Sequence, residues 1–186
     1  IDTGTVTIQG NYIGTTPTSR TDRGNQHNII CDGGTVTIGG SAAGEGNVMG
    51  DASDNSIECN GASNVTIQGN YIGTDSTFAD IGNANSGILV NSTGTIQIGG
   101  TGANEHNWIC WNDANGQDAA IHIDNGSPVI QGNYLGTNAA GAQLQNRYSI
   151  YSDTGADSYT IGGSGANEGN VMGDSTVQEI YINNSS

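Results

Sequence analysis

The stretch VTIQGNYIGT at Val6–Thr15 decides the fold, because the chain repeats it. It returns without change at Val65–Thr74 and, slightly altered, as PVIQGNYLGT at Pro128–Thr137. The three copies begin 59 and 63 residues apart. Self-similarity at a fixed period is the signature of repeat architectures, in which each unit packs on its neighbours. We therefore expect an array of structural repeats rather than an ordinary globular domain.

A second motif alternates with the first. It combines IGG with a later GNVMGD or a related run, and it occupies Thr37–Asp51, Gln97–Cys110 and Thr160–Asp174. Because the two motifs alternate, each repeat of about 60 residues contains two half-units of about 30. We predict one domain, residues 1–186, built from three double repeats and a final partial coil. The boundaries are 1–55, 56–118, 119–177 and 178–186.

Each half-unit contains three very short segments separated by Gly, Asn and Asp, which is typical of short strands. Alternation in these segments places Val or Ile inward and Thr, Gln or Glu outward. The first strands are expected at Asn28–Cys31, Ser56–Cys59, Gly87–Val90, Ala120–Ile123, Ser149–Ser152 and Glu179–Ile182. The second strands are expected around Val6/Ile8, Val36/Ile38, Val65/Ile67, Ile96/Ile98, Ile130 and Ile161, and a third strand after the Asn of each motif.

Three strands per turn that recur in register predict an all-β parallel β-solenoid. We expect about six coils of roughly 30 residues, because an isolated turn cannot bury its apolar residues whereas stacked turns share one core. The IQGNYIGT and IGGxxxGxGNVM motifs resemble the repeats of large secreted or surface bacterial proteins, within the right-handed parallel β-helix proteins of the pectate-lyase-like superfold. The resemblance covers essentially the whole chain. It implies a right-handed solenoid but no particular function, since this scaffold carries lyases, hydrolases, tailspikes, adhesins and ice-binding proteins.

Charge excludes two classes of partner. The formal net charge is −15, with three Arg residues and no Lys. Such a surface cannot bind the phosphates of nucleic acid or anionic lipid. No apolar run approaches the roughly 18 residues of a membrane span. We therefore expect neither nucleic-acid binding nor membrane insertion, and we place the protein outside the cell or on the cell surface.

One Asn precedes every third strand and should form a column at one corner of the solenoid. Stacked side-chain amides bond along such a column, so a buried polar corner stays satisfied. We interpret this column as a structural ladder rather than a site. Its members are Asn11, Asn47, Asn70, Asn107, Asn133 and Asn170.

An outward position follows each of these asparagines, and four of the six residues there are aromatic. A regular apolar stripe indicates a contact surface for a sugar chain, another subunit or a neighbouring protein. The alternative is that the following loops, such as Thr15–His27, fold back over it. The stripe consists of Tyr12, Val48, Tyr71, Trp108, Tyr134 and Val171.

The second strands carry outward threonines in two ranks, which resemble the Thr-x-Thr arrays of ice-binding solenoids. Thr is also a common residue of exposed strands. Asn64, Gln97, Val129 and Tyr159 interrupt the array. Ice binding is therefore kept as an alternative function. The ranks are Thr5, Thr7, Thr35, Thr37, Thr66, Thr95 and Thr160.

Glu45, Glu105 and Glu168 recur in the loop before the Asn, but only in alternate coils. Two rungs separate them by about 10 Å, which is too far for one shared cation. We interpret them as solvated loop carboxylates. Ca²⁺ bound by a single loop, with help from Asp51 or Asp174, is the alternative, and no other cofactor is expected.

Three cysteines without a CxxC pair form neither a disulfide framework nor a zinc site. Cys31 and Cys59 end the first strands of successive coils, where the rung spacing suits a disulfide. Stacked reduced thiols fit equally well. Cys110 lies in another column and should be unpaired.

No catalytic constellation is recognised. The β-helix lyases use Ca²⁺-binding carboxylates with an Arg or Lys base, and the β-helix hydrolases use paired Asp residues with His. Neither sequence motif is present in this chain. The acidic residues Asp22, Asp32, Asp113, Asp118 and Asp124 are scattered over loops, and His27, His106 and His122 fall in different columns. We therefore predict a protein that is not an enzyme.

The chain begins and ends at nearly the same phase of the coil, and it opens at Ile1 without Met, as if cut from something longer. Bare solenoid ends expose core and unpaired strand edges. We predict that copies stack head to tail as a filament subunit, or that the chain is a stalk segment of a larger surface protein. Six coils would give an axial repeat of about 29 Å. A carbohydrate-binding or adhesive module that uses the aromatic stripe is an alternative.

Overall fold

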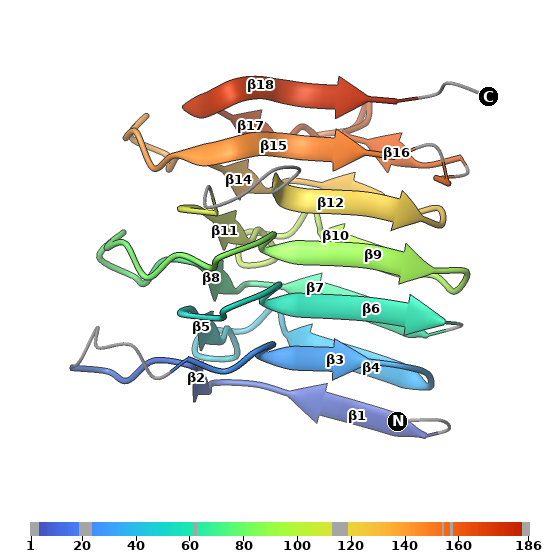
Figure 1. Cartoon of the computed structure of the whole chain (residues 1–186), viewed down its shortest axis with the longest axis horizontal. Helices are drawn as coiled ribbons and strands as arrows, with labels where there is room; N and C mark the ends of the chain where they lie inside the picture. Colours follow the sequence, from blue (N-terminus) through green and yellow to red (C-terminus); the bar gives the residue numbers. More distant parts are fainter. Residues whose placement is uncertain are drawn as a thin grey trace.

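Figure 1 shows a computed structural model of the chain as a stack of parallel strands that rises from the N-terminal to the C-terminal coil. The structure describes residues 4–18, 24–61, 63–112, 119–153, 155–156 and 158–183. All regular elements in these ranges are β-strands. The chain enters three sheets in turn, here called A, B and C, and each sheet contains six strands.

Sheet A contains the expected second strands. They are β1 (Thr5–Ile8), β4 (Thr35–Gly39), β7 (Asn64–Gln68), β10 (Ile96–Gly99), β13 (Val129–Gln131) and β16 (Thr160–Ile161). Sheet B contains the expected third strands, each of two residues. They are β2 (Tyr12–Ile13), β5 (Val48–Met49), β8 (Tyr71–Ile72), β11 (Trp108–Ile109), β14 (Tyr134–Leu135) and β17 (Val171–Met172).

Sheet C contains the expected first strands. They are β3 (Ile29–Cys31), β6 (Ile57–Gly61), β9 (Ile88–Ser92), β12 (Ala119–Asn125), β15 (Asn146–Ser152) and β18 (Ser175–Ile182). The last two start earlier than predicted, because Asn146 already pairs with Ser175. About five full turns of roughly 30 residues connect the six rungs. The predicted all-β parallel solenoid with three strands per coil is confirmed.

The repeats stack in register, and this builds the core. Val36 pairs with Val65, and Ile38 with Ile67, so that like residues lie above one another. A side-chain period of two then directs each of these columns inward along its whole length. Ile38, Ile67, Ile98 and Ile130 are fully buried in one continuous cluster. The core is therefore a set of aliphatic columns rather than a compact centre.

The IGG motif is explained by the corner between sheets A and B. Gly39 has a φ of +80°, which favours glycine. A Cβ there would also overlap the carbonyl oxygen of Gln68 and the side chain of Asn70 in the next coil. Gly99 has the same relation to Gln131. Glycine is therefore required in the motif because the backbone of one coil lies so close to that of the next.

The cysteines are reduced in this structure. Cys31 and Cys59 are paired in register on β3 and β6 and are both buried, yet neither forms a disulfide. Of the two alternatives for this pair, the structure has the stacked thiols. Burial raises the pKa of the Cys110 thiol to about 12, and this cysteine is also free.

Candidate functional site

The asparagine column forms a hydrogen-bonded ladder along the corner before sheet B. The backbone N and the Nδ2 of Asn70 both donate to Oδ1 of Asn107, at 3.0 Å each. Asn107 in turn donates from Nδ2 to Oδ1 of Asn133 at 2.9 Å. The same step links Asn11 to Asn47. Asn107 is fully buried, so these amides satisfy a polar corner that water does not reach.

A second ladder, which sequence reasoning missed, runs along the corner between sheets B and C. Nδ2 of Asn83 donates to Oδ1 of Asn112 at 2.8 Å, and Nδ2 of Asn112 donates to Oδ1 of Asn146 at 3.1 Å. Asn112 and Asn146 are fully buried, and Asn83 nearly so. Asn83 and Asn112 lie in loops of different length and Asn146 begins β15, so no shared motif marks them. Both ladders stabilise corners and leave the outer faces for any function.

The aromatic stripe forms one column on the outer face of sheet B. The rings of Tyr71 and Trp108 stack with centroids 4.6 Å apart and planes 5° from parallel. Trp108 and Tyr134 stack at 5.9 Å and 8°. Two positions are strongly exposed, Tyr12 at 50% and Val171 at 46%, whereas the four between them are half-buried. The ring faces within the stack are therefore occupied by one another.

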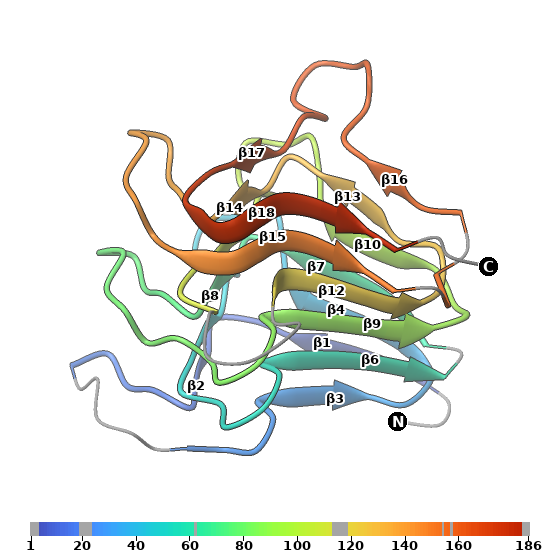
Figure 2. The same ribbon diagram turned by 45° about the horizontal axis from the view of Figure 1, so that its top comes forward.

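Neighbouring loops cover part of this column. Phe78 packs edge-on against both Tyr71 and Trp108, at 6.2 and 6.3 Å. His106 packs edge-on against Trp108 and Tyr134, at 4.5 and 5.4 Å. Burial lowers the pKa of His106 below its ordinary value. The faces and part of the edges of the Tyr71–Trp108–Tyr134 stack are thus covered, whereas Tyr12 and Val171 remain strongly exposed. Figure 2 shows that the loops after β2, β8 and β14 project on the same side of the solenoid.

Cavities lie along both edges of sheet B, beside the loops that precede and follow its strands. One of about 500 Å³ is lined by Tyr12, Val48, Thr15–Thr18 and Asp75–Thr77. Two smaller ones, of about 200 and 410 Å³, recur one repeat apart beside Tyr71 and Tyr134. Another, of about 590 Å³, follows the corner between sheets B and C. It includes Trp111, whose φ is +63° and whose buried Nε1 has no hydrogen-bond partner among the described residues.

The three recurring glutamates cap their own loops. Oε2 of Glu45 accepts the backbone N–H of Ala42 at 2.9 Å, and Oε2 of Glu105 accepts that of Gly102 at 2.8 Å. Glu168 does the same for Gly165. Each carboxylate therefore has a local structural partner. Among the residues that the structure describes, no cluster of three His, Cys, Asp or Glu side chains suits a metal ion. Asp22, Asp113 and Asp118 lie outside these residues.

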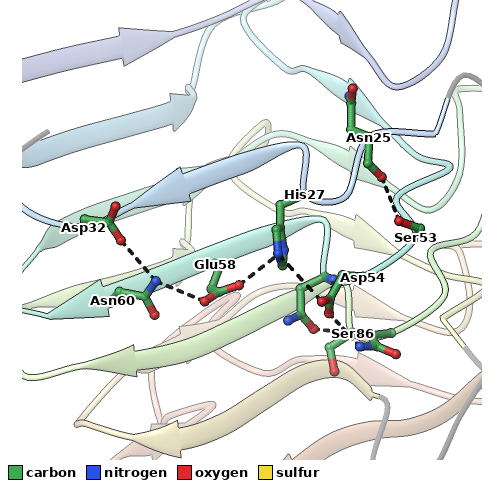
Figure 3. A network of polar contacts seen from close by, with 10 residues as sticks. Asn25, His27, Asp32, Ser53, Asp54, Glu58, Asn60 and Ser86 are labelled. Atoms are coloured by element: carbon green, nitrogen blue, oxygen red, sulfur yellow. Dashed lines mark hydrogen bonds and ion pairs between the residues drawn. The ribbon is translucent and has the colours of Figure 1, made fainter.

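His27, which matched no recognised sequence motif, lies in an acidic network on sheet C (Figure 3). Its Nδ1 lies 3.2 Å from Oε2 of Glu58, and its Nε2 lies 3.7 Å from Oδ2 of Asp54. The Nδ1 contact lacks hydrogen-bond geometry, so it is an ion-pair contact when the ring is protonated. Asn60 donates to both Glu58 and Asp32, at 3.0 and 3.2 Å.

The same network reaches the third coil, because Asn85 donates to Oδ1 of Asp54 at 2.6 Å. It therefore ties three successive coils together across sheet C. Sequence spacing could not reveal it, because His27 and Asp54 lie in loops whereas Glu58 lies on β6.

A second histidine, His122, lies close to the carboxylate of Asp153. Nε2 of His122 lies 3.1 Å from Oδ2 of Asp153, whose Oδ1 accepts the Tyr151 hydroxyl at 3.4 Å. The Tyr151 ring is nearly buried and stacks on Tyr181 at 5.0 Å. This cluster of β12, β15 and β18 is a packed aromatic surface. Its parts come from three coils, so the sequence did not bring them together.

The threonine ranks lie on strands of sheet A, except for Thr95, which directly precedes β10. Thr5, Thr35, Thr95 and Thr160 are exposed, whereas Thr37 and Thr66 are half-buried. Asn64 stands opposite Thr35 in the register, so the outer rank is interrupted. Ice binding stays an untested prediction.

The described residues include no helix long and apolar enough to cross a membrane. Comparison of the chain with models of protein families, with curated proteins and with solved structures gave no match.

Proposed function

We propose that the chain is a structural, non-enzymatic solenoid whose copies stack head to tail outside the cell, as a filament subunit or as part of a surface stalk. The finer resemblance to secreted or surface bacterial β-helix repeats supports the extracellular location. The acidic, Lys-free surface suits this role, because like charge on neighbouring filaments opposes lateral clumping. This function requires no cofactor.

The observation that carries the proposal is an uncovered core at the uppermost coil. Ile180 and Ile182 on β18 are 42% and 48% exposed. Ile180 pairs in register with Ile150, which is fully buried. Ile180 thus continues the column of Ile121 and Ile150, which is covered at both of these inner rungs, and Ile182 pairs with the buried Ser152. Fully burying such a side chain contributes about 1.5–3 kcal/mol, and because these two are already about half covered, a further coil would gain about half of that value for each.

A second copy is the occupant that fits best, because the order of half-units would continue across the junction. The uppermost coil carries the GNVMGD motif, and the lowest carries IQGNYIGT. Inside the chain the same step runs from Asn47 to Asn70, where the lower amide donates to the upper Oδ1. Asn170 ends the ladder: it accepts from Asn133 and donates from Nδ2 to the carbonyl of Ile130 in the coil below, which leaves its backbone N–H and one Nδ2 hydrogen for a further coil. Asn11 begins the ladder as a donor to Asn47, so its Oδ1 is left for a coil below. The two ends are therefore complementary in polarity.

Glycines of the uppermost coil support the same conclusion. A Cβ on Gly46 would overlap the carbonyl oxygen of Gly69 in the coil above. The equivalent Gly169 has no atom within 4 Å of such a Cβ. Among the described residues, no close contact therefore requires glycine at this position. In a stack, the carbonyl of Gly10 of the next copy would take the place that Gly69 takes over Gly46.

The test is to substitute Gly169→Ala and to compare assembly by sedimentation and light scattering. We expect the wild type to form long particles and the variant to stay monomeric with unchanged urea unfolding. Gly46→Ala should destabilise the fold itself, whereas Thr160→Ala, on the outer face of the same rung, should assemble normally. A wild type that stays monomeric at high concentration, or a Gly169→Ala variant that assembles equally well, would overturn the proposal.

A further inference from the structure

The centre of the aromatic column shows how sheet B holds a flat ring. Trp108 lies between Tyr71 and Tyr134, parallel to both within 8°, with centroid distances of 4.6 and 5.9 Å. Tyr71 and Tyr134 belong to coils two rungs apart, and Trp108 belongs to the coil between them. Two rungs of the solenoid therefore leave room for a single stacked ring, and in the middle repeat the chain supplies that ring itself.

The first repeat has the same arrangement without its central ring. Val48 pairs in register with Tyr12 below and Tyr71 above, and thus occupies the position equivalent to Trp108. Two rungs separate the outer strands by about 9.6 Å, so a ring midway would lie about 4.8 Å from each tyrosine rung, within the stacking range. A cavity of about 500 Å³ lies over Val48 and is lined by Tyr12 and by the loop after Tyr71. We call this space the Val48 slot.

The surroundings of the Val48 slot differ from those of Trp108 in one decisive respect. Phe78 and His106 meet the periphery of the Trp108 ring with aromatic edges. At the Val48 slot, His106 is replaced by Gly46 in the equivalent loop position. The remaining periphery is mainly hydroxylic. It consists of Thr15, Thr16, Pro17, Thr18, Asp75, Ser76 and Thr77.

A ring that fits this environment has apolar faces and a rim of hydrogen-bonding groups. Pyranose sugars have this character, because their axial C–H bonds form apolar faces while their hydroxyls point outward. We propose that the Val48 slot binds a pyranose ring of a neutral glycan over Val48, against the Tyr12 ring and between the rungs of Tyr12 and Tyr71. This binding function goes beyond self-assembly and does not depend on it.

Charge selects among sugars. Asp75 lies at the rim of the slot, held by the backbone N and the hydroxyl of Thr77 at 2.7 and 2.6 Å from its Oδ1. The whole chain carries a net charge of −15. The carboxylate at the rim and the negative net charge of the chain disfavour a uronate or other anionic sugar. The ligand class is therefore a neutral rather than an acidic glycan.

The test fills the Val48 slot with an indole ring, the ring that Trp108 supplies at the equivalent position. Val48→Trp should fold, because Trp108 occupies an equivalent position in the same column, where it is also flanked by a tyrosine on each side. Binding of neutral glucan, mannan, galactan and chitin hexasaccharides is measured by saturation-transfer NMR and calorimetry, with oligogalacturonate as the acidic comparison. We expect at least one neutral hexasaccharide to bind and Val48→Trp to weaken it at least about tenfold.

Ile30→Trp is the matched control, since Ile30 is an exposed aliphatic residue on β3, far from sheet B in the coil, and it should leave the affinity unchanged. Tyr12→Ala keeps the test valid should Val48→Trp not fold, and it should also weaken binding. The proposal is overturned when no neutral hexasaccharide binds at millimolar concentration, when Val48→Trp binds like the wild type, or when indole binds and the sugars do not. Measuring the Gly169→Ala monomer separates this result from any failure of stacking.

Discussion

The buried part of the asparagine ladder should contribute far more to stability than its exposed end, and Asn107→Ala measures this directly. The Asn107 side chain accepts two hydrogen bonds from Asn70, at 3.0 Å each, and donates to the carbonyl of Ile67 at 2.8 Å and to Asn133 at 2.9 Å. At about 0.5–1.5 kcal/mol for each bond, removing all four reduces the free energy of unfolding by about 2–6 kcal/mol.

The upper part of this range is expected, because the backbone N–H of Asn70 is left buried without a partner. Asn11→Ala is the matched control. Its side chain is exposed and donates only to Gln9 and Asn47, so water replaces these bonds and the loss should stay below about 1 kcal/mol. Urea unfolding followed by circular dichroism gives both values. Equal losses in the two variants, or a loss below about 1 kcal/mol for Asn107→Ala, would refute the ladder as a main source of stability.

Three further outcomes follow from single side chains. Burial raises the pKa of Cys110 from 9.0 to about 12, so the unfolded chain releases this proton first and the free energy of unfolding should fall by up to about 1.4 kcal/mol per pH unit between these values. Cys110→Ala should reduce that slope in urea unfolding, and an unchanged slope would contradict the assignment. Burial lowers the pKa of His106 below 6.5, so the stability due to its neutral form should be lost as the pH falls below that value, and His106→Gln should flatten the acid limb of the same titration. A steeper limb in the variant would oppose this. Glu105→Ala removes the acceptor of the Gly102 N–H and should cost about 1 kcal/mol, whereas Glu105→Gln should retain most of it; identical losses would show that the cap is unimportant.

Motif repetition was enough to predict the strands and the first ladder. The residues of these elements recur at the same place in every half-unit, and stacking in register makes sequence equivalence the same as spatial neighbourhood. Thus Asn70 and Asn107 could be matched by their place in the repeated motifs. The reduced state of Cys31 and Cys59 could not be predicted, because one rung spacing suits both a disulfide and two thiols.

Side-chain clusters built from unequal loops were not predictable. Asn83 and Asn112 lie in loops with different sequences and lengths, and His27 and Asp54 belong to no repeated motif. The direction of the aromatic rings also has no sequence signal. Alternation places Trp108 outward, but only the structure shows that its faces are covered by neighbouring rings. Because the ring faces of Trp108 are covered, the proposed glycan site is the Val48 slot rather than an open aromatic face along the whole column.

In the proposed filament, the lowest coil of one copy stacks on the uppermost coil of the copy before it. Cryo-electron microscopy of the concentrated native protein tests it most directly. We expect filaments whose subunits repeat about every 29 Å along the axis, from six rungs of about 4.8 Å each, with strands that run across the filament. Monodisperse monomers, or filaments with a clearly different axial rise, would contradict it.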